Sequence, residues 1–111
     1  MEFRRELVGA TTTTLILSVL QREPGHGYEI VRRVNEMSDG VFRWREGTIY
    51  PALHRLEKEG WIEGRWRKIS PAKKRRVYSI TDDGARALKL RTKEWEVYSV
   101  AIGKILDAAP A

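Results

Sequence analysis

The sequence predicts a mainly helical fold with one small β-hairpin. Three stretches carry apolar residues at helical spacing, two short segments rich in β-forming residues follow them, and a long helical stretch ends the chain. The chain has 111 residues, of which 41% are hydrophobic and 32% are charged. This length suits one compact domain, and this composition argues against intrinsic disorder.

The first two helices follow from apolar periodicity and from the Pro and Gly residues that stop it. The first is expected over residues 10–21, with a start as early as Glu2, and it ends before Pro24. The second is expected over residues 27–37 and is closed by residues 38–40, Ser-Asp-Gly. These helices are the first half of the expected core.

A third helix is expected over residues 48–59, with Gly60 as its stop,. Pro51 lacks a backbone N–H and is expected only within the first turn of a helix. This restriction places the start of the helix between Glu46 and Thr48.

Two β-strands are expected over residues 61–66 and 75–80, which are rich in Trp, Ile, Val and Tyr,. Residues 67–74 would then form a long basic tip between them. Thr81 is a good N-cap for a last helix that runs to about residue 108,. The chain is therefore divided into residues 1–81, which hold three helices and the hairpin, and a final helical segment over residues 82–111.

The excess positive charge lies in one segment. The formal net charge is +6, and residues 61–81 hold seven Lys or Arg against one Glu. Acidic and basic residues balance in the two flanking parts, nine against nine before this segment and five against five after it. A charge run of this kind is either a solvated surface or a binding surface for an anionic partner, and its structural setting has to decide.

That setting is the element order of a winged helix-turn-helix, namely three helices, a hairpin and a closing helix. In this fold the third helix enters the major groove of DNA and the hairpin contacts the phosphate backbone. Arg65 lies beside the expected basic tip. The expected phosphate contacts on the hairpin are Arg67, Lys68, Lys73, Lys74, Arg75 and Arg76,.

The third helix has an expected DNA-facing side, because four of its residues lie opposite the apolar stripe of Ile49, Leu53 and Leu56. These four residues are Thr48, Pro51, Arg55 and Lys58, with His54 beside them. Arg55 suits a bidentate contact with guanine, and Thr48 suits a phosphate or a thymine methyl group. For Lys58 a DNA contact and an ordinary solvated side chain both stay open, and for Tyr50 a phosphate contact and a packing role both stay open.

Three motifs together resemble those of the PadR family. They are His26-Gly27-Tyr28-Glu29-Ile30, Gly47-Thr48-Ile49-Tyr50-Pro51-Ala52-Leu53-His54-Arg55-Leu56-Glu57 and Arg76-Val77-Tyr78-Ser79-Ile80-Thr81-Asp82-Asp83-Gly84. The resemblance implies a dimeric transcriptional regulator, usually a repressor, that is often released from its operator by a small molecule. A single final helix is similar to the short subfamily, in which the first and last helices form the dimer.

The same resemblance implies a ligand site at the dimer interface, where some members hold flat aromatic molecules close to a tryptophan. Trp95 occupies the matching position, and Tyr98, Ser99 and Ile102 would line the pocket with it. Trp95 has a second interpretation, as a seam residue that buries apolar area between two subunits. Both interpretations require a dimer.

Other function classes find little support in the sequence. The chain has no cysteine and two histidines, His26 and His54, neither of which has a second ligand at metal spacing, so no metal and no cofactor is expected,. No catalytic triad, paired carboxylates or phosphate-binding loop is recognisable, and no apolar run is long enough to span a membrane. We therefore expect a cytoplasmic regulator without enzymatic activity. The alternatives are a winged-helix module that binds only proteins, and a regulator of another winged-helix family such as a MarR-like one.

Overall fold

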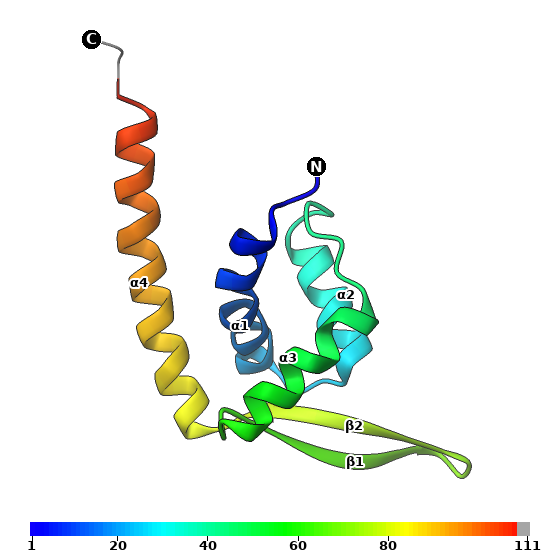
Figure 1. The fold of residues 1–111 in the computed structure, drawn as a ribbon. Coiled ribbons are helices and arrows are strands. Elements are labelled where there is room, and N and C mark those ends of the chain that lie inside the picture. Colours follow the sequence, from blue (N-terminus) through cyan, green and yellow to red (C-terminus); the bar gives the residue numbers. More distant parts are fainter. Residues whose placement is uncertain (109–111) are drawn as a thin grey trace.

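The computed structural model describes residues 1–108 and confirms a mainly helical winged-helix fold (Figure 1). A two-stranded antiparallel hairpin lies below three helices, and a long fourth helix rises along one side. The elements are α1 (Arg5–Arg22), α2 (Gly27–Met37), α3 (Glu46–Lys58), β1 (Ile62–Ser70), β2 (Lys73–Ile80) and α4 (Asp82–Leu106). We call the hairpin, residues 62–80, the wing.

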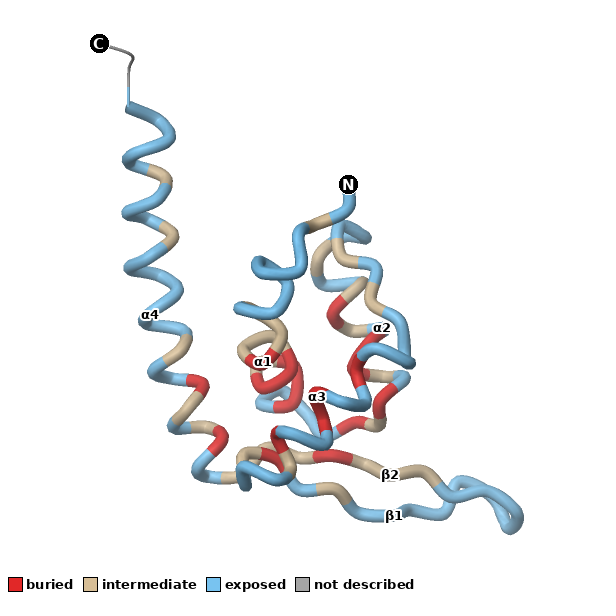
Figure 2. Tube along the Cα trace, in the orientation of Figure 1, coloured by how far each residue is buried: buried red, intermediate tan, exposed pale blue. Residues whose placement is uncertain are grey.

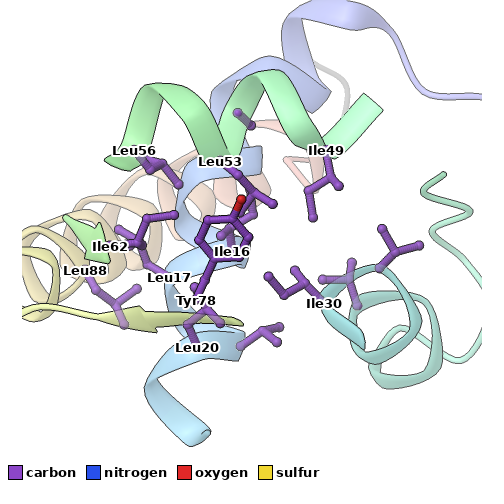
Figure 3. Close-up of a cluster of buried hydrophobic side chains, with 14 residues drawn as sticks. Ile16, Leu17, Leu20, Ile30, Ile49, Leu53, Leu56, Ile62, Tyr78 and Leu88 are labelled. Carbon is purple, nitrogen blue, oxygen red and sulfur yellow. The ribbon is translucent and has the colours of Figure 1, made fainter. Parts of the chain in front are cut away.

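The core lies where α1, α2 and α3 meet above the base of the wing (Figure 2). Side chains from all three helices, both strands and the start of α4 converge there (Figure 3). The largest fully buried side chains are Ile16, Leu17, Leu20, Ile30, Ile49, Leu53, Leu56 and Ile62. Burial of this apolar surface is the main force that holds α3 against the rest of the domain.

The boundaries of α2 agree with those expected from the sequence, and its first turn has a capping box. The ring of His26 accepts a hydrogen bond from the backbone N–H of Glu29, and the Glu29 carboxylate accepts one from the backbone N–H of His26. Two N–H groups that the helix leaves without partners are thereby satisfied.

The expectation for Pro51 was wrong in one respect. Helix α3 begins at Glu46, so Pro51 lies in the second turn rather than the first. The backbone N–H of Thr48 bonds the carbonyl of Arg45, three residues earlier, which is the spacing of a tighter first turn,.

The expected long basic tip of the hairpin was also wrong. The strands pair from Ile62 with Ile80 as far as Ser70 with Lys73, with one irregularity between Lys68 and Ser70. Only Pro71 and Ala72 connect them. Lys is depleted in strands, but on an exposed ribbon basic side chains stay in water while the backbone forms the ladder.

The base of the wing is joined to the turn between α1 and α2. Gly25 and Tyr78 exchange two backbone hydrogen bonds, of 3.0 and 2.9 Å. This bridge pairs the outer edge of β2 near its base and leaves the outer part of the wing projecting from the domain (Figure 1). The wing therefore has a fixed base and a protruding tip.

Helix α4 is anchored at its start and exposed over most of its length (Figure 2). Thr81 caps it by accepting a hydrogen bond from the backbone N–H of Gly84, as expected. Gly84 and Leu88 are its buried residues among those that the structure describes. The final helix ends at Leu106, and residues 109–111 of the expected dimerisation segment lie outside the described residues.

Candidate nucleic-acid interface

The two sides of α3 differ as the sequence predicts. Ile49, Leu53 and Leu56 are buried in the core. All six residues proposed for DNA contact on this helix are exposed, namely Thr48, Tyr50, Pro51, His54, Arg55 and Lys58. Helix α3 thus presents a continuous polar face to solvent beside the wing.

Two residues of this face have contacts within the domain. The hydroxyl of Thr48 donates a hydrogen bond of 2.8 Å to the carbonyl of Arg45, in the first turn of α3. The ring of Tyr50 packs on the start of α2, where a Cβ on Gly27 would lie 3.0 Å from the Tyr50 hydroxyl oxygen. Tyr50 nevertheless stays 44% exposed. Tyr50 therefore has the packing role that was one of its two interpretations. Its exposed edge still leaves room for a contact with a phosphate.

Four basic residues of the wing lie beyond its anchored base. Arg67, Lys68, Lys73 and Lys74 are exposed, and none of the ion pairs found within residues 1–108 involves them. Because the tip projects from the domain, these charges face solvent together and suit a polyanion such as a phosphate backbone.

Arg75, in contrast, faces the N-terminus of α2. Its guanidinium lies 3.1 Å from Nε2 of His26, and the arginine is half-buried. Burial lowers the pKa of His26 below its usual value, the Glu29 carboxylate opposes this effect, and the charge of Arg75 lowers the pKa further. A neutral imidazole has a single acceptor nitrogen, and Nδ1, which accepts from Glu29, also lies 3.4 Å from the guanidinium; a protonated imidazole has no acceptor,. Arg75 therefore ties the wing to α2.

Arg76 points to the opposite side of the wing and contacts α3. Its guanidinium donates a hydrogen bond to the carboxylate of Glu57, and this bond raises the pKa of Arg76. The same group lies 5.7 Å from the ring centroid of Trp66 and 6.0 Å from that of Tyr78. Contact of Arg75 and Arg76 with DNA stays a prediction, while both side chains have partners within the domain that join the wing to the helices.

Sequence reasoning missed Glu57 and Trp66 as parts of this site. Glu57 stood in the middle motif and Trp66 in the first expected strand, but neither was assigned a role at the interface. A useful signal was the alternation of side chains along paired strands, which places Trp66 directly opposite Arg76,.

The structure brings two of the four proposed ligand-binding residues together with α1. Trp95 and Tyr98 line an open groove of about 1020 Å³ whose other wall includes Phe3, Leu7 and Thr14. Ser99 and Ile102 lie farther along α4 and are not among the lining residues of this groove. Its open side leaves Trp95 47% and Tyr98 62% exposed.

Within residues 1–108, no group of three or more His, Cys, Asp or Glu side chains is placed to hold a metal ion. In the same part of the chain, no helix combines the length and the apolar character needed to cross a membrane.

Comparison with known proteins decides the family. The sequence profile of the transcriptional regulator PadR-like family matches residues 16–90 of this chain, from the middle of α1 into α4. This chain belongs to the PadR family of transcriptional regulators. The match covers both structural elements of the candidate interface, α3 and the wing.

Solved structures of similar proteins support this assignment. A transcriptional regulator from Clostridium thermocellum is 32% identical and has a TM-score of 0.82, covering 89% of this chain and 96% of its own. A PadR-like transcriptional regulator from Bacillus cereus is 30% identical and has a TM-score of 0.80, covering 94% of this chain and 99% of its own. A sequence comparison also finds a transcriptional regulator from Mycobacterium tuberculosis that is 42% identical over 53 residues, which are 48% of this chain and 49% of that protein.

Proposed function

We propose that this PadR-family regulator binds double-stranded DNA as a homodimer, with α3 in the major groove and the wing on the phosphate backbone. The observation that carries the proposal is the group of exposed cations on the wing, Arg67, Lys68, Lys73 and Lys74, beside the exposed face of α3. A module that binds only proteins has no need to place its whole excess of positive charge on this element.

The surface of α4 supports a dimer. Beyond Leu88, residues at helical spacing form an apolar stripe that includes Trp95, Tyr98, Ile102 and Ile105,. These side chains are 38–76% exposed in the single chain, and Leu7 on α1 is 51% exposed. A stripe of this length is unfavourable in water and would be covered by the same stripe of a second copy related by two-fold symmetry.

We further propose that the regulator represses transcription and is released by a planar aromatic molecule bound beside Trp95. The groove between α1 and α4 has a volume close to that of small-molecule sites, which run to about 1000 Å³,. Its aromatic residues, Phe3, Trp95 and Tyr98, suit stacking with a flat ring,. A molecule held there would lie between the helices of the proposed dimer, where it could change the spacing of the two α3 helices.

Selection of duplexes from a random library, followed by sedimentation of the complex, tests the DNA-binding proposal. We expect two chains on each selected duplex, with half-sites centred about one helical turn, roughly 34 Å, apart. Absence of duplex binding, or tight binding of a single chain to a complete site, would contradict the proposal.

Release by an effector is tested by titrating planar aromatic compounds into the protein–operator complex. A compound that releases wild-type protein should act far more weakly on Trp95→Ala, and Trp95→Phe should keep part of the response. Equal release of the wild type and Trp95→Ala would count against a site at Trp95.

A further inference from the structure

The face of the wing that looks toward α3 carries an exposed tryptophan. Gly64 pairs with Tyr78 and Trp66 pairs with Arg76, so these four residues share one face of the hairpin,. Tyr78 lies at the base and is buried, whereas Trp66 lies farther out and is 65% exposed. A large aromatic surface is thus left in water on the most basic element of the protein.

The indole is held in place by its neighbours. The Arg76 guanidinium lies 5.7 Å from the centroid of the Trp66 ring and is itself fixed by its ion pair with Glu57 on α3. Gly64 leaves room for this arrangement, because a Cβ at that position would lie 2.6 Å from Nε of Arg76. The contacts that run from Glu57 through Arg76 to Trp66 therefore fix the indole relative to α3.

Trp66 shares a groove with the exposed face of α3. The groove has a volume of about 890 Å³, and its walls are formed by His54, Arg55, Glu57, Lys58, Trp66, Arg76 and Tyr78. Any molecule that reaches Arg55 and Lys58 along this groove therefore also meets the indole. The exposed cations around it, on α3 and on the wing, complement an anionic strand,.

We propose that Trp66 contacts DNA directly, with its exposed indole packed against a deoxyribose of the strand whose phosphates are bound by the surrounding cations. This inference rests on the proposed DNA-binding function. The sugar offers an apolar surface for the ring, and the contact removes apolar area of both partners from water. Unlike a lysine contact it releases no counterion, so it adds affinity without adding to the salt dependence of binding.

The test compares Trp66→Ala and Trp66→Phe with the wild type on one duplex, at several salt concentrations. We expect Trp66→Ala to bind about five- to tenfold more weakly, the lower part of the range measured for aromatic contacts with nucleic acids. Trp66→Phe keeps a flat ring and should retain most of the affinity. The slope of log affinity against log salt should be the same in all three proteins.

Controls separate this inference from its alternatives. Val41 is 57% exposed in the segment between α2 and α3, away from the groove, so Val41→Ala should bind like the wild type. Thermal unfolding monitors the fold of each variant. If Trp66→Ala unfolds the wing, Trp66→Thr places a strand-forming residue without a ring there and should bind as weakly as expected for Trp66→Ala. Unchanged affinity of Trp66→Ala would overturn the inference. A flatter slope of log affinity against log salt in Trp66→Ala would overturn it as well, because loss of a charge contact means that Trp66 acts only by placing Arg76. Failure of the wild type to bind any duplex would instead refute the proposed function.

Discussion

The guanidinium of Arg76 on β2 is ion-paired with the carboxylate of Glu57 on α3. The wing and the helix proposed to read the bases are therefore joined by side chains as well as by the connecting chain. Both partners are half-buried, with side-chain exposures of 32% and 27%. A fixed angle between the two elements would let both contact one duplex without further ordering, which lowers the entropic cost of binding.

Glu57→Gln tests whether this pair positions the wing. Removal of a negative charge beside DNA should by itself strengthen binding, because the net charge becomes more positive. We expect the opposite, a several-fold weaker binding measured by fluorescence anisotropy, because Arg76 loses its charged partner. Glu59→Gln is the matched control, since it removes the same charge from the end of α3 at a residue without an ion pair within residues 1–108. Equal affinities of the two variants would contradict a positioning role.

The burial of His26 predicts a loss of stability in mild acid. Burial lowers the pKa of His26 in the folded chain below its ordinary value of 6.5, so between these two values the unfolded chain binds more protons. Stability from this residue is complete above pH 6.5 and is lost as the pH falls through the folded pKa,. His26→Asn keeps an N-cap acceptor but does not titrate. The free energy of unfolding, measured between pH 7.5 and 5.5, should therefore decrease more in the wild type than in His26→Asn.

Gly84 in the first turn of α4 should not tolerate a side chain. A Cβ at this position would lie 2.0 Å from the carbonyl oxygen of Trp61, which is backbone and has little freedom to move. We expect Gly84→Ala to lower the free energy of unfolding by about 1–3 kcal/mol through overpacking. Gly103 lies in the same helix, and a Cβ added there would meet no atom beyond its own turns of helix within 4 Å, so Gly103→Ala should be stabilising by about 0.5–1 kcal/mol,. Denaturant unfolding at one protein concentration measures both, and equal effects of the two substitutions would contradict this account.

Arg55 should contribute to sequence preference as well as to affinity. It is exposed on α3 and lines the groove shared with the wing. We expect Arg55→Ala to lose about 1–3 kcal/mol on the selected operator and to relax selection at one base position. Lys73→Ala removes a backbone contact and should weaken selected and random duplexes equally. Equal losses of Arg55→Ala on both kinds of duplex would remove Arg55 from base recognition.

The helices were predicted well because apolar periodicity and the residues that stop a helix are local features of the sequence. The start and end of α2 follow from the turn at Pro24-Gly25 and from residues 38–40, and the exposed face of α3 follows from helical spacing,. The length of the strands was not predictable from composition, because residues 67–70, Lys73 and Lys74 form strands through pairing with the opposite strand rather than through propensity,.

The roles of Arg75 and Arg76 depend on contacts between residues far apart in the sequence. Arg75 meets His26 across 49 positions, and Arg76 meets Glu57 across 19. Adjacent residues on a strand point to opposite faces, which predicts that the two arginines differ, but only the packing of the wing on α2 and α3 identifies their partners. Within the expected ligand site, Trp95 and Tyr98 line the groove against α1, whereas Ser99 and Ile102 do not.

The salt dependence of duplex binding tests most directly whether the wing binds phosphates. The decisive variant lacks two wing lysines. Lys73→Ala with Lys74→Ala removes two exposed charges from the wing, and Lys89→Ala with Lys93→Ala removes two exposed charges from α4. If the wing binds phosphates, the slope of log affinity against log salt should flatten in the wing variant by about one for each lysine that both chains of the dimer lose. In the α4 variant the slope should stay unchanged. Identical slopes in both variants would contradict the account.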